Sequence, residues 1–340
     1  MKRFLQITAI AALTFFFLYL FLRNADLRGV WQIIKTTNFF WLAVALLTNL
    51  AALFLRTIRW QAILGPEDPP PFYPTFFANT VGYMLSTILP VRAGDVARPA
   101  LLARRTSLRF SGALGTVLTE RVLDLFTILL LFVYFAALRW QEFSTNPETA
   151  RWFFVVKAGA VASGVLLAAL TFFIAGLYFF RSFVRRMHGF LGRLVPRRYR
   201  DAWMHFFDTF VETLELTRHR SAFFKVMTCT AAIWACLTGQ FYFTALALHH
   251  PLPYDASIFV TGVTTVGLAI PTPGGVGGFH KACQLVLTRF YGFHIDLSVA
   301  TAVVFHIVGT VPVIVIGLLL VAREGVRWRD VTRSTQTPEA

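Results

Sequence analysis

Long apolar segments alternate with short basic connections along most of the chain. Six segments contain the roughly 18–20 apolar residues that cross a bilayer as one helix. They are about 4–22, 39–58, 113–138, 152–180, 222–248 and 298–321. Two other apolar segments, 73–90 and 256–271, are marginal in length as spans, and each ends at a proline. The pattern predicts an all-α polytopic membrane protein with about six full spans.

The basic residues indicate the side of the membrane on which each connection lies, because Lys and Arg collect in cytoplasmic loops. Arg56 and Arg59 close the second span, and the loop 181–220 is dense in arginine. The connection 139–151 has balanced charge, and 249–255 carries no Lys or Arg. Both termini are therefore expected in the cytoplasm. Three basic residues oppose this scheme, because they fall in a connection that it places outside: Arg23, Arg28 and Lys35.

This orientation turns the two short segments into re-entrant hairpins. The second span ends inside and the third begins inside, so 73–108 must enter and leave from the cytoplasm. By the same reasoning, 256–293 enters and leaves from the outside. Each short segment runs into a Gly-containing turn and then into a second helical stretch, 95–108 or 279–292.

The two halves of the chain then have the same order of elements in opposite orientations. Each half reads span, hairpin, span, as in transporters with inverted repeats, where the substrate site lies at broken helices. The repeats are expected at about 39–138 and 222–321, within a single integral membrane domain, 1–340. The hairpin tips are PVRAGD, 90–95, and PTPGGVGG, 271–278.

Composition supports a membrane body and excludes several other classes of protein. Hydrophobic residues make up 56% of the chain and charged residues 14%, against about 25% charged in a soluble domain. The net charge of +15 follows from the basic cytoplasmic loops, so we expect no nucleic-acid partner. The three cysteines lack the spacing of metal ligands, and no nucleotide-binding motif occurs. We expect no metal and no cofactor.

Two further segments concern the membrane surface. The N-terminal apolar run is longer than the 7–15-residue core of a signal peptide and has no small-x-small cleavage site, so we expect a retained span. Within the basic loop 181–220, residues 197–216 place aromatic and aliphatic side chains at helical spacing, with charges opposite. This predicts an interfacial helix whose arginines attract anionic lipid headgroups.

The first tip combines a helix break with positive charge. Pro90 ends a helix, Gly94 permits a positive φ, and Asp95 can cap the helix that follows. Arg92 and Arg98 flank this helix start, where free N–H groups and guanidinium groups suit an anion. The alternative is that both arginines are interface residues that reach toward lipid headgroups.

The span that begins near residue 113 carries charges in TERVLD, 119–124. Glu120 and Asp124 share a helix face, and the two carboxylates repel each other unless a cation lies between them. An unpaired charge at bilayer depth costs at least about 2.5–3.5 kcal/mol, so Arg92 or Arg98 is expected as a partner. Together with Arg121, these groups form either a structural salt bridge or a site coupled to protons or headgroups.

The second tip breaks the helix with two prolines and several glycines. Irregular backbone at membrane depth is tolerated only where it is buried in protein or lines a polar cavity. The residues concerned are Pro271, Pro273, Gly274, Gly275, Gly277 and Gly278.

Two ionisable residues follow this tip. Lys281 is placed to hold a phosphate, and His280 either titrates near neutral pH or is a hydrogen-bonded structural group. His306 and Gln240, on other spans, either face the same cavity or pack.

These motifs resemble the flippase-like membrane family that includes the transmembrane half of lysylphosphatidylglycerol synthase. PVRAGDVAR, ERVLD and PTPGGVG match its P-x-R-x-G-[DE]-x-x-R, E-R-x-x-D and P-[TS]-P-G-G-x-G motifs in order. The resemblance implies a bacterial or archaeal inner-membrane protein that moves or presents lipids with polar headgroups. Hopanoid metabolism and glycosylation of polyprenyl lipid are associated with some members. The residues carried over by position are Pro90, Arg92, Gly94, Asp95, Arg98, Glu120, Arg121, Asp124, Pro271, Pro273, Gly274, Gly275 and Gly277.

One position departs from the family pattern. The family usually has a glutamate three residues after the last motif glycine, where this chain has His280. A permanent acid is replaced by a group that can switch its charge near neutral pH, so the role of the glutamate does not transfer to this chain.

The sequence therefore predicts a transporter for a lipid with an anionic headgroup. Arg92, Arg98 and Lys281 would hold the anion, while Glu120 and Asp124 would position the arginines or relay protons. An intramembrane transferase with Glu120 or His280 as general base is the alternative, and a scaffold subunit of a lipid-biosynthetic complex is another. Lipid-biosynthetic enzymes are accordingly possible partners.

Overall fold

The computed structural model of the protein describes residues 2–89, 93–141, 147–179, 200, 219–268, 270 and 272–325. In this part of the chain the regular elements are helices, without strands. The elements are α1 (Lys2–Leu22), α2 (Leu27–Lys35), α3 (Phe39–Leu64), α4 (Phe72–Ile88), α5 (Gly94–Ala103), α6 (Phe110–Leu138), α8 (Pro147–Phe179), α11 (Arg220–Ala247), α12 (Tyr254–Gly267), η3 (Pro273–Gly275), α13 (Gly278–Phe290) and α14 (Ile295–Arg323). The chain is an all-α polytopic membrane protein, as predicted.

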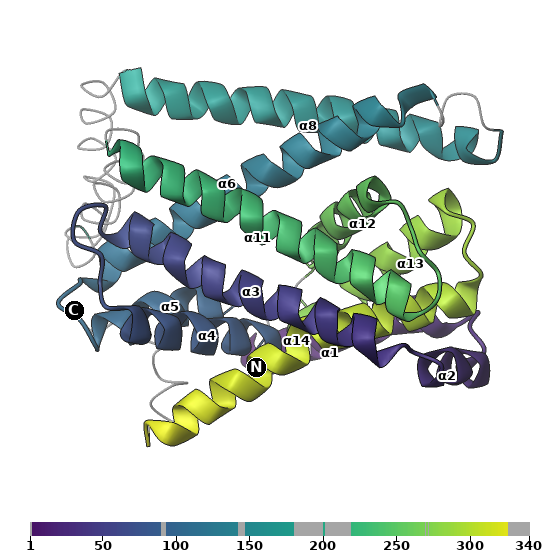
Figure 1. The fold of residues 1–340 in the computed structure, drawn as a ribbon, viewed down its shortest axis with the longest axis horizontal. Coiled ribbons are helices and arrows are strands. Elements are labelled where there is room, and N and C mark those ends of the chain that lie inside the picture. The colour runs from purple at the N-terminus through teal and green to yellow at the C-terminus, as the bar shows by residue number, and fades with distance from the viewer. Residues whose placement is uncertain are drawn as a thin grey trace.

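Five of the six expected spans are long and apolar enough to cross a bilayer: α3, α6, α8, α11 and α14. The expected first span, about 4–22, lies within α1, which packs against α13, and the continuous part of this helix whose side chains are described, Ala12–Leu22, is apolar. The long helices lie roughly side by side (Figure 1). Many of their large apolar side chains face outward, such as Leu47, Phe154 and Leu319, which suits helices surrounded by lipid.

Two pairs of shorter helices form the expected hairpins (Figure 1). The first hairpin starts and finishes at the end of the bundle where α3 finishes and α6 begins, and its tip, between α4 and α5, lies inside the bundle. The second hairpin starts and finishes at the opposite end, where α11 finishes and α14 begins, and its tip, between α12 and α13, also lies inside the bundle. The turn η3, at the tip of the second hairpin, packs against α4. The two hairpins therefore enter from opposite ends and meet inside the bundle.

The first hairpin is closed by the approach of two backbones. A Cβ on Gly94 would overlap the carbonyl oxygen of Gly82 on α4, and a Cβ on Gly82 would lie 2.6 Å from Cγ of Arg98. Gly94 is the first residue of α5, and a positive φ, as expected for it, does not occur there. The glycine is needed for space between the helices rather than for its backbone angles.

The start and end of α5 also differ from expectation. Ala93 is the N-cap residue, and no side chain caps the helix, so the predicted cap by Asp95 is wrong. Asp95 lies in the first turn, where a carboxylate favours the positive end of the helix dipole. The helix ends at Ala103 instead of continuing to residue 108.

The second tip has the irregular backbone that its glycines predict. Gly274 and Gly277 have φ values of 60° and 92°, which side chains with a Cβ rarely adopt. Pro273 begins the short turn η3, and α13 begins directly after Gly277. A Cβ on Gly274 would lie 3.0 Å from the carbonyl oxygen of Thr87, at the end of α4. The backbone of the second tip therefore touches the first hairpin.

The helix α2 was not anticipated, because its residues fall in a connection that was read only for charge. Asp26 caps this helix by accepting a hydrogen bond from the backbone N–H of Arg28 at 3.0 Å. Its own backbone N–H donates to Asp296 at the start of α14, at 2.8 Å. Arg28 and Lys35 thus lie on a helix that packs against α14.

An ion pair ties each hairpin region to a span at its own end of the bundle. Arg105, just after α5, pairs with Glu324 at the end of α14, at 3.1 Å, and Tyr73 donates to the same carboxylate at 2.6 Å. The Tyr73 hydrogen bond, together with Arg105, keeps the pKa of Glu324 below its usual value. At the other end, Arg139 after α6 pairs with Asp255 in the first turn of α12, at 2.6 Å.

The last span contains a proline, and a neighbouring helix supplies a donor for the carbonyl that the proline leaves without one. Pro312 has no N–H, so the carbonyl of Val308 loses its helical partner. The side-chain amide of Asn49 on α3 donates to this carbonyl at 3.1 Å, and to that of Gly309 at 3.4 Å. Gln240 on α11 likewise donates to the carbonyl of Phe305 at 3.1 Å. Gln240 therefore has a structural contact here.

Replacing Asn49 with alanine is expected to destabilise the protein by about 1–3 kcal/mol, because it leaves a buried carbonyl without a donor. The measurement is thermal unfolding of the purified protein in detergent. Thr48→Ala is the matched control, since its hydroxyl bonds to the carbonyl of Ala45 in its own helix and links no other element. Equal melting temperatures for the two variants would show that Asn49 does not support the kink.

Candidate functional site

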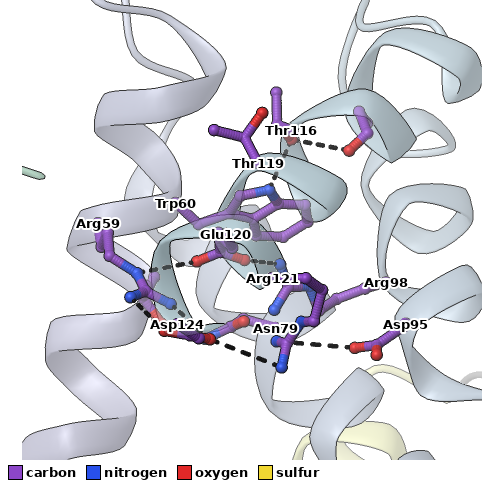
Figure 2. Close-up of polar contacts among 12 residues, drawn as sticks. Arg59, Trp60, Asn79, Asp95, Arg98, Thr116, Thr119, Glu120, Arg121 and Asp124 are labelled. Carbon is purple, nitrogen blue, oxygen red and sulfur yellow. Dashed lines mark hydrogen bonds and ion pairs between the residues drawn. The ribbon is translucent and has the colours of Figure 1, made fainter. Parts of the chain in front are cut away.

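A cluster of charged side chains lies between α3, α5 and α6 (Figure 2). We call it the ionic cluster, and its members are Arg59, Asp95, Arg98, Glu120, Arg121 and Asp124. The side chains of Arg59 and Arg98 are 1% exposed, and that of Glu120 is fully buried. Charges at this depth persist only when they are paired, and the pairing explains why they stay in apolar helices.

Glu120 on α6 is the central acceptor of the ionic cluster. Arg59 Nε donates to Glu120 Oε1 at 3.3 Å, and Arg98 Nη2 donates to Oε2. The Arg98 guanidinium also lies over the ring of Trp60, 4.3 Å from its centroid, a contact that stabilises a desolvated cation. The expected pairing of Arg98 with the TERVLD carboxylates is confirmed.

The two carboxylates of α6 are bridged by Arg59. Its Nη1 lies 2.8 Å from Asp124 Oδ1 and its Nη2 lies 3.4 Å from Oδ2, in addition to the bond to Glu120. A cation was expected between the two acids, but Arg59 had been taken for an interface residue that ends the second span. The signal was available, because the helix continues past it with the mostly apolar residues 60–64.

Arg121 is held more loosely than the other two arginines. Its ion pairs with Asp95 and Asp124 measure 3.8 Å and 3.6 Å, too long for good hydrogen bonds. The side chains of Arg121, Asp95 and Asp124 are 27%, 25% and 20% exposed. These three residues form the open edge of the ionic cluster, whereas Arg59, Arg98 and Glu120 form its closed interior.

Tyr83 on α4 joins the ionic cluster to the first hairpin. Its hydroxyl accepts from Arg98 Nη1 at 3.3 Å and from Arg121 Nη2 at 3.4 Å. Arg56, one turn before Arg59 on α3, lies over the Tyr83 ring at 4.9 Å from its centroid. Three guanidinium groups therefore converge on one phenol. The sequence reading did not single out Tyr83, since nothing in its local pattern distinguishes it from other aromatic residues.

The second hairpin places two histidines together. The backbone N–H of Gly277 donates to His280 Nδ1 at 3.4 Å, so the histidine helps to hold the start of α13. The His280 ring lies 4.6 Å from that of His306 on α14, and 5.1 Å from that of Phe21. The structure thus brings His280 and His306 to one place, as the shared-cavity interpretation requires, and gives His280 a structural contact as well.

Lys281 connects α13 to the end of α1. Its ammonium donates to the carbonyl of Leu20 at 2.9 Å and to Gln284 Oε1 at 2.6 Å. Gln284 in turn donates to the carbonyl of Phe21 at 2.9 Å, so both side chains satisfy carbonyls at a helix C-terminus. No hydrogen bond or ion pair in the described residues links Lys281 or His280 to the ionic cluster. A role of Lys281 in binding an anion stays a prediction.

Several predicted residues fall in parts of the chain that the structure does not describe. They are Pro90, Arg92, Pro271 and most of the basic loop 181–220, including the expected interfacial helix 197–216. Their roles stay predictions. Among the residues that the structure does describe, no group of three His, Cys, Asp or Glu side chains is arranged to hold a metal ion.

The chain belongs to the family described as lysylphosphatidylglycerol synthase TM region, which it matches over residues 5–317. The match covers both hairpins, the ionic cluster and all but the last turns of α14. It confirms the resemblance found in the sequence motifs and indicates a function related to membrane lipids. No curated protein matches the chain.

Proposed function

We propose that this protein is a transporter that moves or presents a lipid with an anionic polar headgroup across the inner membrane of a bacterium. The lipid is a phospholipid or a polyprenyl-linked or hopanoid-type lipid, and both termini of the protein lie in the cytoplasm. One observation carries the proposal: a partly open ionic cluster connects the first hairpin to α3 and α6. Membership of a lipid-related membrane family supports it.

The ionic cluster offers a polar headgroup charged hydrogen-bond partners inside an otherwise apolar bundle of helices. A headgroup that enters the bilayer loses its hydration, and preformed guanidinium groups replace part of that loss. The acyl or isoprenoid chains stay in the surrounding lipid, against the apolar outer faces of the helices. Since the sequence has no nucleotide-binding motif, a gradient or consumption of the lipid would drive net movement.

The site fits an intramembrane transferase less well. A general base must lie within hydrogen-bond reach of the reacting proton, but Glu120 is fully buried and each of its oxygens accepts from a guanidinium group. His280 Nδ1 likewise accepts from the backbone of Gly277. Both candidate bases are engaged in holding the fold. A scaffold role in a lipid-biosynthetic complex predicts no movement of lipid by the purified protein.

Reconstitution into liposomes tests the proposal. A fluorescent phosphatidylglycerol on the inner leaflet becomes accessible to a membrane-impermeant quencher only when it crosses the bilayer. Asp95→Asn is expected to slow this movement at least about tenfold, because Asp95 links the first hairpin to Arg121 on α6 (a loss of about 1.4 kcal/mol). Asp68→Asn is the matched control, since Asp68 lies exposed in the connection between α3 and α4.

Two results would count against transport, and a third would count against the role of the ionic cluster in it. One is product formation when the purified protein receives lipid and a group donor, which favours the transferase. Another is a wild-type protein that moves no more lipid than empty liposomes. The third is equal movement by Asp95→Asn and Asp68→Asn, which would remove the ionic cluster from the transport step.

A further inference from the structure

We infer that Arg56 and Arg121, together with Tyr83, form the binding site for one tetrahedral oxyanion, the phosphate of the lipid headgroup. Arg59, Arg98 and Glu120 form the support on which that site rests. The inference depends on the proposed function for the source of the phosphate, but the binding site can be tested without any transport step.

The charge balance around the ionic cluster leaves one cation over. Within the described residues, its carboxylates are Asp95, Glu120 and Asp124, and Arg56 adds a fourth guanidinium to those of Arg59, Arg98 and Arg121. Arg56 joins this group through Tyr83, because its guanidinium lies over the Tyr83 ring. Four cations therefore face three anions in a mostly buried place, which favours one further anion.

Unused hydrogen-bonding capacity near Tyr83 lies mainly on Arg121 and Arg56, and Nε of the fully buried Arg98 also lacks an acceptor among the described residues. Arg59 is occupied by Glu120 and Asp124, but within the described part of the chain Arg121 makes a single hydrogen bond, to Tyr83. Its buried Nε has no acceptor among the described residues, although a guanidinium carries five N–H donors. Arg56 contacts the Tyr83 ring and forms no ion pair or hydrogen bond in the part described. A ring contact orients a guanidinium without using its donors.

Tyr83 completes the site with a donor of its own. Its hydroxyl oxygen accepts from Arg98 and Arg121, and its proton remains available for an acceptor. Arg121 and Arg56 flank this hydroxyl and its ring. A phosphate beside Tyr83 would then receive two guanidinium groups and one hydroxyl, which matches the forked geometry of arginine and a tetrahedral oxyanion.

Access to the site comes from the open edge of the ionic cluster. Arg121 and Asp95 are about a quarter exposed, at 27% and 25%, whereas Arg59 and Arg98 are 1% exposed. Asp95 has the longest of the ion pairs, at 3.8 Å from Arg121. An incoming phosphate would compete with Asp95 for Arg121, so binding weakens a contact between α5 and α6. Asp95 is thus expected to oppose binding rather than to assist it.

The test measures binding of soluble dioctanoyl-phosphatidylglycerol to purified protein in uncharged detergent, with inorganic phosphate as a second probe. Arg56→Gln and Arg121→Gln are expected to weaken lipid binding at least about tenfold each. Arg121→Lys keeps the charge but loses the forked guanidinium, so its lipid affinity is expected to lie between those of the wild type and Arg121→Gln. Asp95→Asn is expected to tighten binding several-fold. Arg28→Gln on α2 is the control, since it removes one exposed positive charge far from Tyr83 along the chain.

The two probes distinguish the sources of the phosphate. Binding of both probes, with the same loss in Arg56→Gln, supports the site and assigns it to free phosphate as well as to the lipid. Binding of the lipid alone, with that loss, supports the site and assigns it to the headgroup in its membrane setting.

Other outcomes overturn the inference. Unchanged lipid affinity in Arg56→Gln would do so, and this variant breaks no ion pair of the described structure, so misfolding does not obscure the result. Weaker binding in Asp95→Asn would show that Asp95 holds the ligand instead of competing with it.

Lipid binding that depends on Arg56 but is not followed by movement in liposomes would reject the proposed transport and leave the site intact.

Discussion

Replacing Glu120 with glutamine is expected to destabilise the protein by about 3–5 kcal/mol, because it leaves two buried guanidinium groups without their shared counter-charge. Arg59 and Arg98 are each 1% exposed and both donate to this carboxylate. Asp124 still neutralises Arg59 in the variant, but among the described residues Arg98 then keeps the neutral hydroxyl of Tyr83 and the rings of Trp60 and Tyr83. The main loss therefore falls on Arg98.

Thermal and denaturant unfolding of the purified protein in detergent measure this effect. Asp255→Asn is the matched control, since it also removes a carboxylate from an ion pair, the one with Arg139. That pair is partly exposed, so its loss is expected to cost within about 1 kcal/mol. The double variant Glu120→Gln/Arg98→Met should recover part of the lost stability, because it removes the unpaired charge and keeps the volume. Equal stability of Glu120→Gln and Asp255→Asn would contradict the central role of Glu120.

The spans and the hairpins were predictable because the bilayer sets the length of a crossing helix. The segments 73–90 and 256–271 were too short to cross comfortably, and the positions of arginine required each to return to its own side. The structure has both hairpins, α4–α5 and α12–α13. The expected ends differ by a few residues, since a helix end depends on contacts that the local sequence does not contain.

The candidate site was predictable in part. Glu120 and Asp124 were recognised because two acids on one helix face in an apolar span must have cationic partners, and Arg98 is one of them. Arg59 was missed because an arginine was assumed to mark the membrane surface. It is buried in the structure since its charge is neutralised by two carboxylates of another helix. A charge ends a span only where no partner is available inside, and partners cannot be read from a single helix.

Contacts between backbones were the least predictable feature. The second tip approaches Thr87 at the end of α4 through Gly274, and the two residues are far apart in sequence. Gly94 was interpreted as a residue that permits a positive φ, whereas in the structure its lack of a side chain leaves room for the carbonyl of Gly82. The two hairpins are therefore in direct contact, as the proposed transport between two sides would require.

Replacing Gly94 with alanine is expected to be more damaging than most single substitutions, with a loss of at least about 3 kcal/mol. The added Cβ would overlap the carbonyl oxygen of Gly82 and the hydroxyl of Ser86, both on α4. A flexible side chain could move aside, but the carbonyl belongs to a helix backbone, so α4 and α5 must separate. Separation would also withdraw Arg98 from Glu120, because Arg98 lies on α5.

The measurement is the fraction of monodisperse protein after extraction, followed by the unfolding temperature of what remains. Gly164→Ala is the matched control, since its Cβ would meet nothing within 4 Å and alanine favours a helix over glycine by up to about 1 kcal/mol. The control is expected to be neutral or slightly more stable, while Gly94→Ala loses its folded fraction. If the two variants behaved alike, the close packing of Gly94 on Gly82 would not be what holds α5 against α4. The position of Arg98 beside Glu120 would then depend on other contacts.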